Sequence, residues 1–491
     1  MILMKKLKII SIPILLMFLC SCSTSSGGST SNNSEPTSTT TSEVSEGSTI
    51  TSSEKIWEKY VSNRNPMSEP KVNRQFYLNH IGDIYNTWKS LEGHGQTIAV
   101  IDVGFKYDHE DFTYEDGTSK VSDKSASFRI DGNQVITEVD KTKLGVTALD
   151  LQHDGWYNNS HGTFCAGVAA AGINGKGVIG IAPLAELMLL KTDGHPLSIC
   201  EAFKYAADNG ARVISISIGS YSDYEGDLYW SKSSINLTSV FNDAVNYCRG
   251  KGTVVISAAG NGGGSSRATE YTYPGATPGV IGSGGLEGNS SSERWSGSSY
   301  NSSSQYMFCD VFAPSHAMFG CSDYSPYYDG GSDDWKGTSF AAPIVAGMAA
   351  LYFERYPNNS VDQFEADLYA SCNGFGSTIQ NGYGRVDVGR LLNTTYSGNV
   401  TIKAKDSTQL YAYVWNSKTD IKEKDYPGNA CSLSGGYYTY TVDTSKYDFI
   451  VISDGSAQTI DLLVTSFMNG NTYDVSSPLL FKDNRYIGYY L

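Results

Sequence analysis

Four apolar runs in the first 300 residues dominate the hydrophobic pattern of this chain. The run Thr97–Ile101 (TIAVI) contains no charged residue and is followed by Asp102. Runs without polar alternation are typical of strands buried on both faces, which occur in parallel sheets covered by helices. The other three runs are Leu187–Lys191, Arg212–Gly219 and Thr253–Gly263.

Stretches with helical spacing lie between and after these runs. They are Glu201–Asn209, Leu237–Arg249 and Phe340–Tyr356. Strands that alternate with helices predict an α/β fold in which a parallel sheet has helices on both faces. In such a fold, functional groups lie at the carboxyl ends of the strands.

The last 98 residues show a different pattern, in which apolar and polar residues alternate between turns of Gly, Asn and Asp. This pattern predicts a small all-β sandwich domain over residues 394–491. The predicted strands are Leu410–Trp415, Tyr437–Val442, Tyr447–Ser453, Ile460–Thr465 and Tyr486–Leu491.

The N-terminus has the pattern of a targeting segment. Three lysines precede the apolar run Ile9–Leu19, which is too short to span a bilayer. The run ends close to Cys22 and resembles a bacterial lipoprotein box with Cys22 as the acylated residue. Cys20 is the alternative lipidation site, and a plain cleaved signal peptide is the alternative to an anchor. We expect residues 1–22 to be a lipoprotein signal and the protein to lie on the membrane, facing outside the cytoplasm.

Residues 23–54 form the predicted linker between this anchor and the folded part of the chain. The segment Ser23–Ser53 contains 20 Ser or Thr in 31 residues and cannot bury enough apolar surface to fold. As a flexible coil it reaches roughly 30 Å. We expect it to hold the folded part away from the membrane.

Charge and cysteine spacing exclude two further classes of function. The net charge of −15 argues against nucleic acid as a partner, because the phosphate backbone repels an acidic protein. Seven cysteines lie beyond Cys22, and because none has CxxC spacing a zinc site has no support. Their odd number leaves at least one unpaired. A disulfide between Cys309 and Cys321 and buried free thiols are both compatible with the sequence.

The stretch Gly337–Pro343 (GTSFAAP) places Ser339 at the start of a predicted helix. Backbone N–H groups there lack intrahelical partners and can hold a developing oxyanion. Taken alone, Ser339 has the simpler interpretation of a helix cap. Three other residues change this interpretation: Asp102 closes a strand, His161 opens a helix in NSHGTFCAG, and Asn261 follows a strand in AAGN.

These four motifs, in the order Asp, His, Asn, Ser, resemble those of the subtilases, a family of serine endopeptidases. The resemblance implies a subtilisin-like domain over residues 55–393 and hydrolysis of peptide bonds in extracellular proteins. It further implies Ser339 as nucleophile, His161 as general base and Asp102 as the residue that orients His161. Asn261 and the Ser339 N–H would hold the oxyanion, and catalysis would need no cofactor.

The resemblance also implies a pocket for the residue before the scissile bond (P1). Ser217 and Gly219 lie at the strand end that pairs with substrate, Ala258 and Gly260 form a wall, and Thr272 lies at the floor. A β-branched floor shortens the pocket, so we expect small to medium apolar P1 residues such as Ala, Val or Leu.

Two further resemblances suggest ligands. Asp111 and Asn174 match positions that hold a structural calcium ion in many subtilases. The C-terminal domain faintly resembles starch-binding modules, with Tyr411, Tyr413 and Gln458 at positions that would contact a glucan. Aromatic residues that only fill the core of the sandwich are the alternative.

Some positions depart from the family pattern. Val103 replaces the usual Ser or Thr after the catalytic Asp, and Pro196 removes a backbone donor from the segment that in the family pairs with substrate. Cys165 lies one turn from His161, where we expect a packing role. These departures keep two alternatives open: a catalytically silent, lipid-tethered binding protein, and a protease carried by a glycan-binding domain.

Overall fold

The computed structural model describes residues 65–147, 159–221, 237–287, 293–302, 307–323, 325–328, 335–375, 379–456, 458–459, 461–470 and 472–474. All of them belong to Ser52–Leu491, the larger of two compact units of the chain. The predicted lipidation site Cys22, the linker and the predicted strand Tyr486–Leu491 lie outside these ranges.

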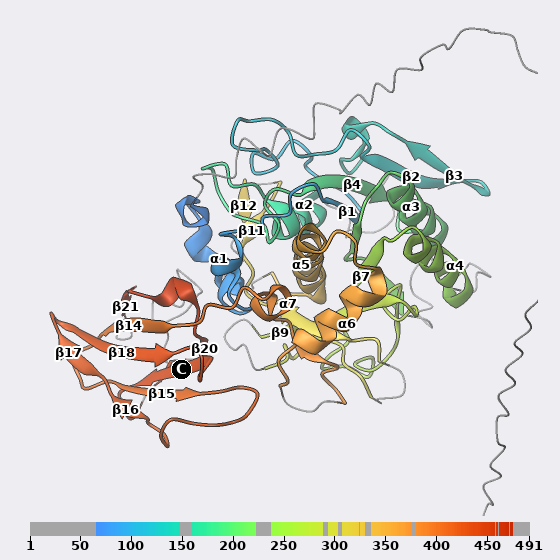
Figure 1. Cartoon of the computed structure of the whole chain (residues 1–491). Helices are drawn as coiled ribbons and strands as arrows, with labels where there is room; N and C mark the ends of the chain where they lie inside the picture. The colour runs from blue at the N-terminus through green and yellow to red at the C-terminus, as the bar shows by residue number, and fades with distance from the viewer. Residues whose placement is uncertain are drawn as a thin grey trace, which may run out of the picture. The chain divides into compact units, whose positions relative to one another are not determined.

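A nine-stranded sheet forms the centre of the α/β domain (Figure 1). Its order is β13-β10-β9-β7-β5-β1-β4-β2-β3, and every neighbouring pair is parallel except β2 with β3. This confirms the predicted parallel α/β fold. In sheet order the strands are β13 (Gly384–Arg385), β10 (Val311–Pro314), β9 (Val280–Leu286), β7 (Val254–Ala258), β5 (Val213–Ile216), β1 (Thr97–Asp102), β4 (Glu186–Thr192), β2 (Ala126–Asp131) and β3 (Gln134–Glu138).

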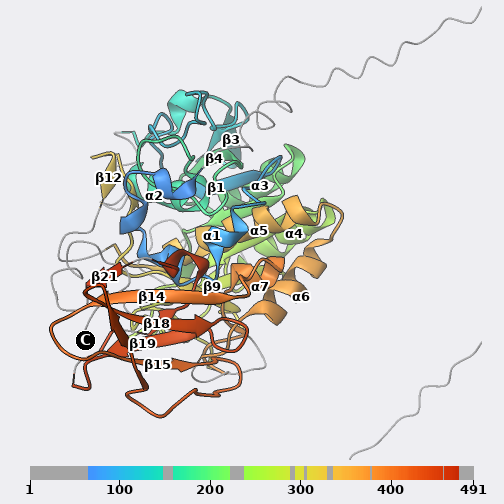
Figure 2. The same cartoon turned by 60° about the vertical axis from the view of Figure 1, so that its left-hand side comes forward.

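Helices cover both faces of this sheet (Figures 1 and 2). On β1, Ile98 and Val100 join the core formed with α2 (Asn159–Ala170) and α5 (Ala341–Arg355). The alternate residues of β1 join a second core with α3 (Pro196–Asp208) and α4 (Leu237–Gly250). Both faces are therefore buried, which explains the uninterrupted apolar runs. Three further helices are α1 (Ile84–Thr87), α6 (Val361–Ser371) and α7 (Val388–Leu392).

The structure corrects the sequence analysis of this sheet at two places. Residues 113–147, for which the sequence pattern predicted no strand, contain β2, which pairs with β4, and β3. Pro196 lies at the first position of α3, where a missing backbone N–H costs no hydrogen bond, and not in a substrate-pairing strand. The His195 side chain caps this helix by accepting from the Leu197 N–H at 3.2 Å.

The C-terminal domain consists of two small, mostly antiparallel sheets, as expected for an all-β domain. Apolar residues such as Val400, Ile402 and Ile450 form its core. One sheet has the order β17-β18-β14-β21 and the other β16-β15-β19-β20. The strands are β14 (Asn399–Lys405), β15 (Tyr411–Trp415), β16 (Asn429–Ala430), β17 (Ser432–Ser434), β18 (Tyr437–Asp443), β19 (Phe449–Ser453), β20 (Leu462–Leu463) and β21 (Thr472–Asp474).

The sequence left open whether any of the cysteines form a disulfide. All seven cysteines of the described residues are free and buried, so the suggested disulfide between Cys309 and Cys321 is wrong. Within the described ranges, no helix has the length and apolar character required to cross a membrane.

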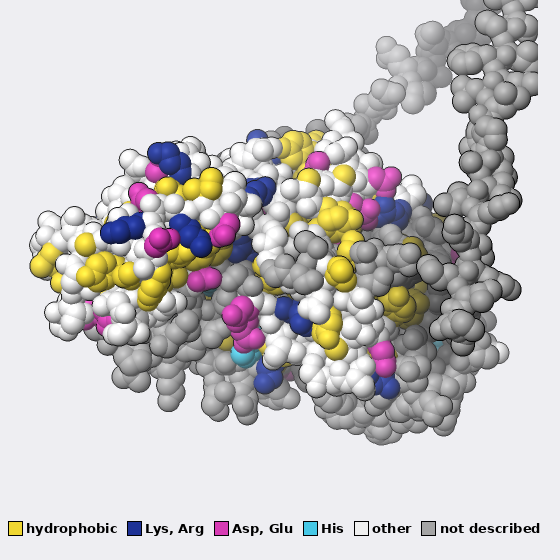
Figure 3. All heavy atoms as spheres, turned by 90° about the horizontal axis from the view of Figure 1, so that it is seen from below, with side chains coloured by type: hydrophobic (Ala, Val, Ile, Leu, Met, Phe, Trp, Pro, Cys, Tyr) yellow, Lys and Arg dark blue, Asp and Glu magenta, His cyan; other side chains and the backbone are white. Residues whose placement is uncertain are grey.

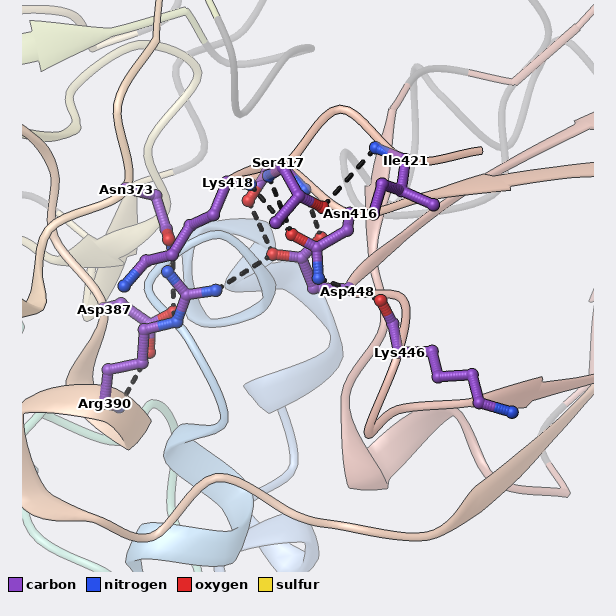
Figure 4. A network of polar contacts seen from close by, with 10 residues as sticks. Asn373, Asp387, Arg390, Asn416, Ser417, Lys418, Ile421, Lys446 and Asp448 are labelled. Atoms are coloured by element: carbon purple, nitrogen blue, oxygen red, sulfur yellow. Dashed lines mark hydrogen bonds and ion pairs between the residues drawn. The ribbon is translucent and has the colours of Figure 1, made fainter. Parts of the chain in front are cut away.

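A charged network joins the C-terminal domain to α7 of the α/β domain (Figure 4). The Arg390 guanidinium lies 3.5 Å from Asp387 Oδ2 and 3.2 Å from Asp448 Oδ2. The Ser417 N–H and hydroxyl both donate to the Asp448 carboxylate, at 2.7 and 2.5 Å. Asp448 thus accepts hydrogen bonds from both domains.

A second polar contact links the C-terminal domain to the beginning of the α/β domain. The Ser466 N–H and hydroxyl donate to the Asp83 carboxylate at 3.1 and 2.8 Å. Asp83 is buried and also caps α1 by accepting from the Asn86 N–H at 3.1 Å. The C-terminal domain therefore supplies partners to groups near both ends of the α/β domain.

We predict that Asp448→Asn destabilises the folded protein by about 1–3 kcal/mol, because it removes the charge that faces a mostly buried guanidinium. Thermal unfolding of the full chain measures this. The control is Asp420→Asn: Asp420 is 84% exposed and 4.0 Å from Lys422, so its loss should cost less than about 0.5 kcal/mol. An equal loss of unfolding free energy in the two variants would show that the Asp448 charge does not stabilise the folded protein through Arg390.

Candidate active site

Close packing of α2 on the end of β1 brings the first two candidate residues together. A Cβ at Gly162 would lie 2.3 Å from the Gly104 carbonyl oxygen and 2.9 Å from the Asp102 Cβ. Only glycine allows this approach. The N-terminal turn of α2, which carries His161, therefore lies directly on the carboxyl end of β1.

Asp102 is fully buried and holds the imidazole of His161. His161 Nδ1 lies 2.9 Å from Asp102 Oδ2 and 3.0 Å from Oδ1. Burial alone lowers the pKa of His161, but the Asp102 charge and hydrogen bond outweigh it and raise that pKa above its ordinary value. The Val103 N–H donates to Asp102 Oδ1 at 2.8 Å. The backbone therefore supports the carboxylate, although the Val103 side chain lacks the hydroxyl of the Ser or Thr usual at this position.

Ser339 lies in a 3-10 turn, Thr338–Phe340, directly before α5. The α-helix therefore begins two residues after Ser339. The Ser339 N–H still lies in the turn that leads into this helix, where backbone donors lack intrahelical partners. The Ser339 hydroxyl donates to the Ser217 carbonyl oxygen at 3.2 Å, and the Ser217 hydroxyl donates to the Ser339 carbonyl oxygen at 2.7 Å. Two hydrogen bonds therefore connect the serine to the end of β5.

The Asn261 side chain is oriented by Thr338. Its Oδ1 accepts from the Thr338 N–H at 2.9 Å and from the Thr338 hydroxyl at 3.0 Å. The amide nitrogen Nδ2 therefore points away from these two Thr338 donors. A Cβ at Gly337 would lie 3.5 Å from Asn261 Nδ2 and 3.7 Å from Ser339 Oγ. The amide donor and the serine hydroxyl therefore border the same space.

The structure adds aromatic residues beside His161 that sequence reasoning missed. Trp335 stacks on Phe164 with ring centroids 4.9 Å apart and lies 6.4 Å from the His161 ring, and Phe340 lies 5.9 Å from that ring. No motif signalled Trp335, because its role depends on a neighbour far away in sequence.

Burial raises the pKa of the Cys165 thiol, which lies 3.4 Å from the Ser339 carbonyl oxygen. This agrees with the expected packing role.

The residues predicted to bind substrate lie at the same edge of the sheet. Ser217 and Gly219 follow β5, and Ala258 ends β7. Thr272 begins β8 (Thr272–Tyr273), which pairs with β6 (Ser220–Tyr221). A Cβ at Gly260 would lie 2.5 Å from Thr272 Oγ1, so the predicted wall and floor of the pocket are in contact.

The predicted calcium positions are engaged in other contacts. The Asn174 amide donates to the carbonyl oxygens of Glu110 and Thr113, and its Oδ1 accepts from the Lys176 N–H at 3.1 Å. Asp111 has a thiol and an imidazole, those of Cys321 and His109, as its neighbours. Burial raises the pKa of Asp111 to about 7. As placed, these side chains do not form the oxygen cage that calcium needs, and calcium binding stays a prediction.

The predicted glycan residues lie on one sheet of the C-terminal domain. Tyr411 and Tyr413 are half-buried on the same side of β15, and Gln458 forms a bridge with Ser453, the partner of Tyr411. Figure 3 shows hydrophobic side chains on the surface of this domain. In the described part of this domain, the large hydrophobic side chains with the highest exposure are Ile421, Tyr426, Leu433 and Tyr437. Glycan binding there stays a prediction.

Comparisons with known proteins agree with this geometry. The model of the subtilase family (Peptidase_S8) matches residues 93–386. Subtilisin DY of Bacillus licheniformis is 29% identical over 305 residues, which cover 61% of this chain and 92% of that protein. Thermitase of Thermoactinomyces vulgaris is 30% identical over 270 residues, which cover 54% of this chain and 77% of that protein.

Solved structures show the same fold. A protease from Pseudoalteromonas arctica has a TM-score of 0.50 at 25% identity, with 67% of this chain and 99% of that chain covered. The epidermin leader peptide processing serine protease of Staphylococcus aureus has a TM-score of 0.50 at 22% identity, with 67% and 83% covered. The family model spans more than half of the sequence, and the chain belongs to the subtilase family of serine endopeptidases.

Proposed function

We propose that this subtilase hydrolyses peptide bonds of extracellular proteins through Asp102, His161 and Ser339 while a lipid on Cys22 holds it at the cell surface. The chain is a subtilisin-like serine endopeptidase that acts on protein substrates. The observation that supports the proposed residues best is the buried Asp102 carboxylate, 2.9 Å from His161 Nδ1. It orients the imidazole as a general base requires.

In the proposed reaction the Ser339 hydroxyl leaves the Ser217 carbonyl oxygen and turns to His161. Ser339 Oγ attacks the scissile carbonyl carbon while His161 accepts its proton. His161 then gives this proton to the leaving amine, and Asp102 stabilises the imidazolium in between. Water repeats the attack on the acyl-enzyme and releases the second product.

Charge on the substrate oxygen develops where two donors converge. These are Asn261 Nδ2, directed by the hydrogen bonds of Oδ1 to Thr338, and the Ser339 N–H. Both donors are fixed before substrate arrives, so they stabilise the tetrahedral intermediate without reorganisation.

We predict that a fluorophosphonate probe labels Ser339 in the full chain. Ser339→Ala should abolish labelling, and His161→Ala should strongly reduce it because the hydroxyl loses its base. Mass spectrometry of the labelled peptide identifies the residue. If Ser339→Ala hydrolyses peptides as fast as the wild type, the mechanism is wrong. A wild type that neither labels nor cleaves would favour the catalytically silent binding protein.

We predict that Asn261→Ala lowers kcat about 10²–10³-fold with little change in KM, because the amide acts on charge that exists only in the transition state. Steady-state kinetics on one peptide substrate measure both constants. A change confined to KM would instead assign Asn261 to ground-state binding.

We predict that the acid limb of the kcat/KM profile lies above pH about 6.5, the ordinary pKa of histidine. The base must be neutral to act, and Asp102 raises the pKa of His161. Asp102→Asn removes that charge, so the limb should move to lower pH while kcat falls about 10⁴-fold. An unchanged limb would show that another group controls the profile.

We predict that the wild-type protein partitions into the detergent phase, whereas Cys22→Ala stays in the aqueous phase or remains uncleaved. Support for the anchor comes from the sequence pattern alone. Cys20→Ala is the matched control and should behave as the wild type. The opposite result for the two variants would move the anchor to Cys20.

A further inference from the structure

The loop that follows α2 contacts two carboxylates at the place where the subtilase pattern predicts calcium. The loop spans residues 172–178 and contains Asn174, and Asp111 contacts it from the segment after β1. Calcium takes six to eight oxygen ligands, so a loop that holds the ion must turn oxygen atoms toward one point. The direction of the N–H groups of this loop therefore tests whether calcium fits.

Backbone N–H groups of the loop point at carboxylates. The Gly175 N–H donates to Glu69 Oε1 at 2.8 Å, and the Val178 N–H donates to Asp111 Oδ2 at 3.0 Å. The N–H groups of residues 174, 176 and 177 also interact with the Glu69 carboxylate. Converging N–H groups of this kind form a site for an anion, and they repel a cation. The Glu69 side chain, which is only 2% exposed, supplies that anion from within the chain.

Oxygen atoms of the loop are already hydrogen-bonded. Asn174 Oδ1 accepts from the Lys176 N–H at 3.1 Å. The Gly177 carbonyl oxygen accepts from the Lys71 N–H at 2.9 Å. A calcium ion would bind these oxygens only after both hydrogen bonds had been broken.

Two carboxylate oxygens beside the loop remain without a hydrogen-bond partner among the described residues. They are Glu69 Oε2 and Asp111 Oδ1, which is fewer than the six to eight oxygens that calcium takes. The Tyr327 hydroxyl packs against the same loop, because a Cβ at Gly177 would lie 1.9 Å from Tyr327 Oη. This hydroxyl donates to Glu110 Oε1 at 2.8 Å. A tyrosine side chain therefore takes up space between the loop and the neighbouring acids.

We propose that the Glu69 carboxylate replaces the calcium ion of many subtilases as the group that holds this loop. The stability of the folded protein then depends on Glu69 and not on the ion. Glu69 lies before the first strand, and the loop follows the helix that carries His161, so one side chain links the beginning of the domain to the end of α2. The inference takes the place of the structural calcium expected from the sequence. Such an enzyme keeps its fold where chelators remove calcium.

Thermal unfolding of the full chain in a Ser339→Ala background tests this inference, because an inactive protease does not digest itself as it unfolds. The melting temperature (Tm) should be the same in excess EDTA and in excess calcium chloride at equal ionic strength, since a bound ion would raise it. Glu69→Gln keeps the size of the side chain but removes its charge. It should lower the Tm by roughly 2–6 °C in both solutions.

Glu201→Gln is the matched control. Glu201 is exposed on α3, so the same change of charge there should shift the Tm by less than about 1 °C. A Tm for Glu69→Gln equal to that of Glu201→Gln would overturn the inference.

A rise of the Tm in calcium that disappears in Asp111→Asn would also overturn the inference, because it would place the ion at this loop. Asn174→Ala takes the place of Asp111→Asn if that variant does not fold. A rise that persists in the variant places the ion elsewhere, and the comparison of Glu69→Gln with its control then decides. The fluorophosphonate probe separates these results from the proposed function. A wild type that is insensitive to calcium but does not react with the probe contradicts the proposed function alone.

Discussion

The distance between the helices α2 and α5 is the constraint on which the rest of the site depends. His161 lies in the first turn of α2, Ser339 lies in the 3-10 turn directly before α5, and both helices pack through small residues. A Cβ at Gly347 of α5 would lie 2.4 Å from the Ile181 Cβ and 3.0 Å from the Ala169 carbonyl oxygen of α2. Because a misplacement of about 1 Å can cost about 10² in rate, this interior packing is a condition of catalysis.

Mostly apolar strands buried on both faces could be predicted from the sequence, and strands of this sheet that depend on glycine or lie at an edge could not. β1 and β5 were predicted because both faces of each strand are buried. β9 was missed because its glycines weaken the strand signal, although Gly282 lies where a Cβ would be 1.8 Å from the Phe308 carbonyl oxygen. β3 was missed because it is an edge strand with polar residues in its pattern.

The motifs named candidate residues for the site but not how their side chains are held. Sequence order says nothing of the contact between the Ser339 hydroxyl and Ser217, or of the way in which Thr338 sets the Asn261 amide. Trp335 joins the site only through ring contacts with residues distant in sequence.

The polar contacts of the C-terminal domain have a consequence for the order in which the protein matures. Asp83 and Arg390 lie near the two ends of the catalytic domain, and their partners Ser466 and Asp448 come late in the chain. A chain that emerges N-terminus first lacks these partners of Asp83 and Arg390 until the late residues arrive. A truncated product never acquires these partners. Completion of the whole polypeptide, and not of the catalytic domain alone, is therefore the point at which this endopeptidase reaches its full stability.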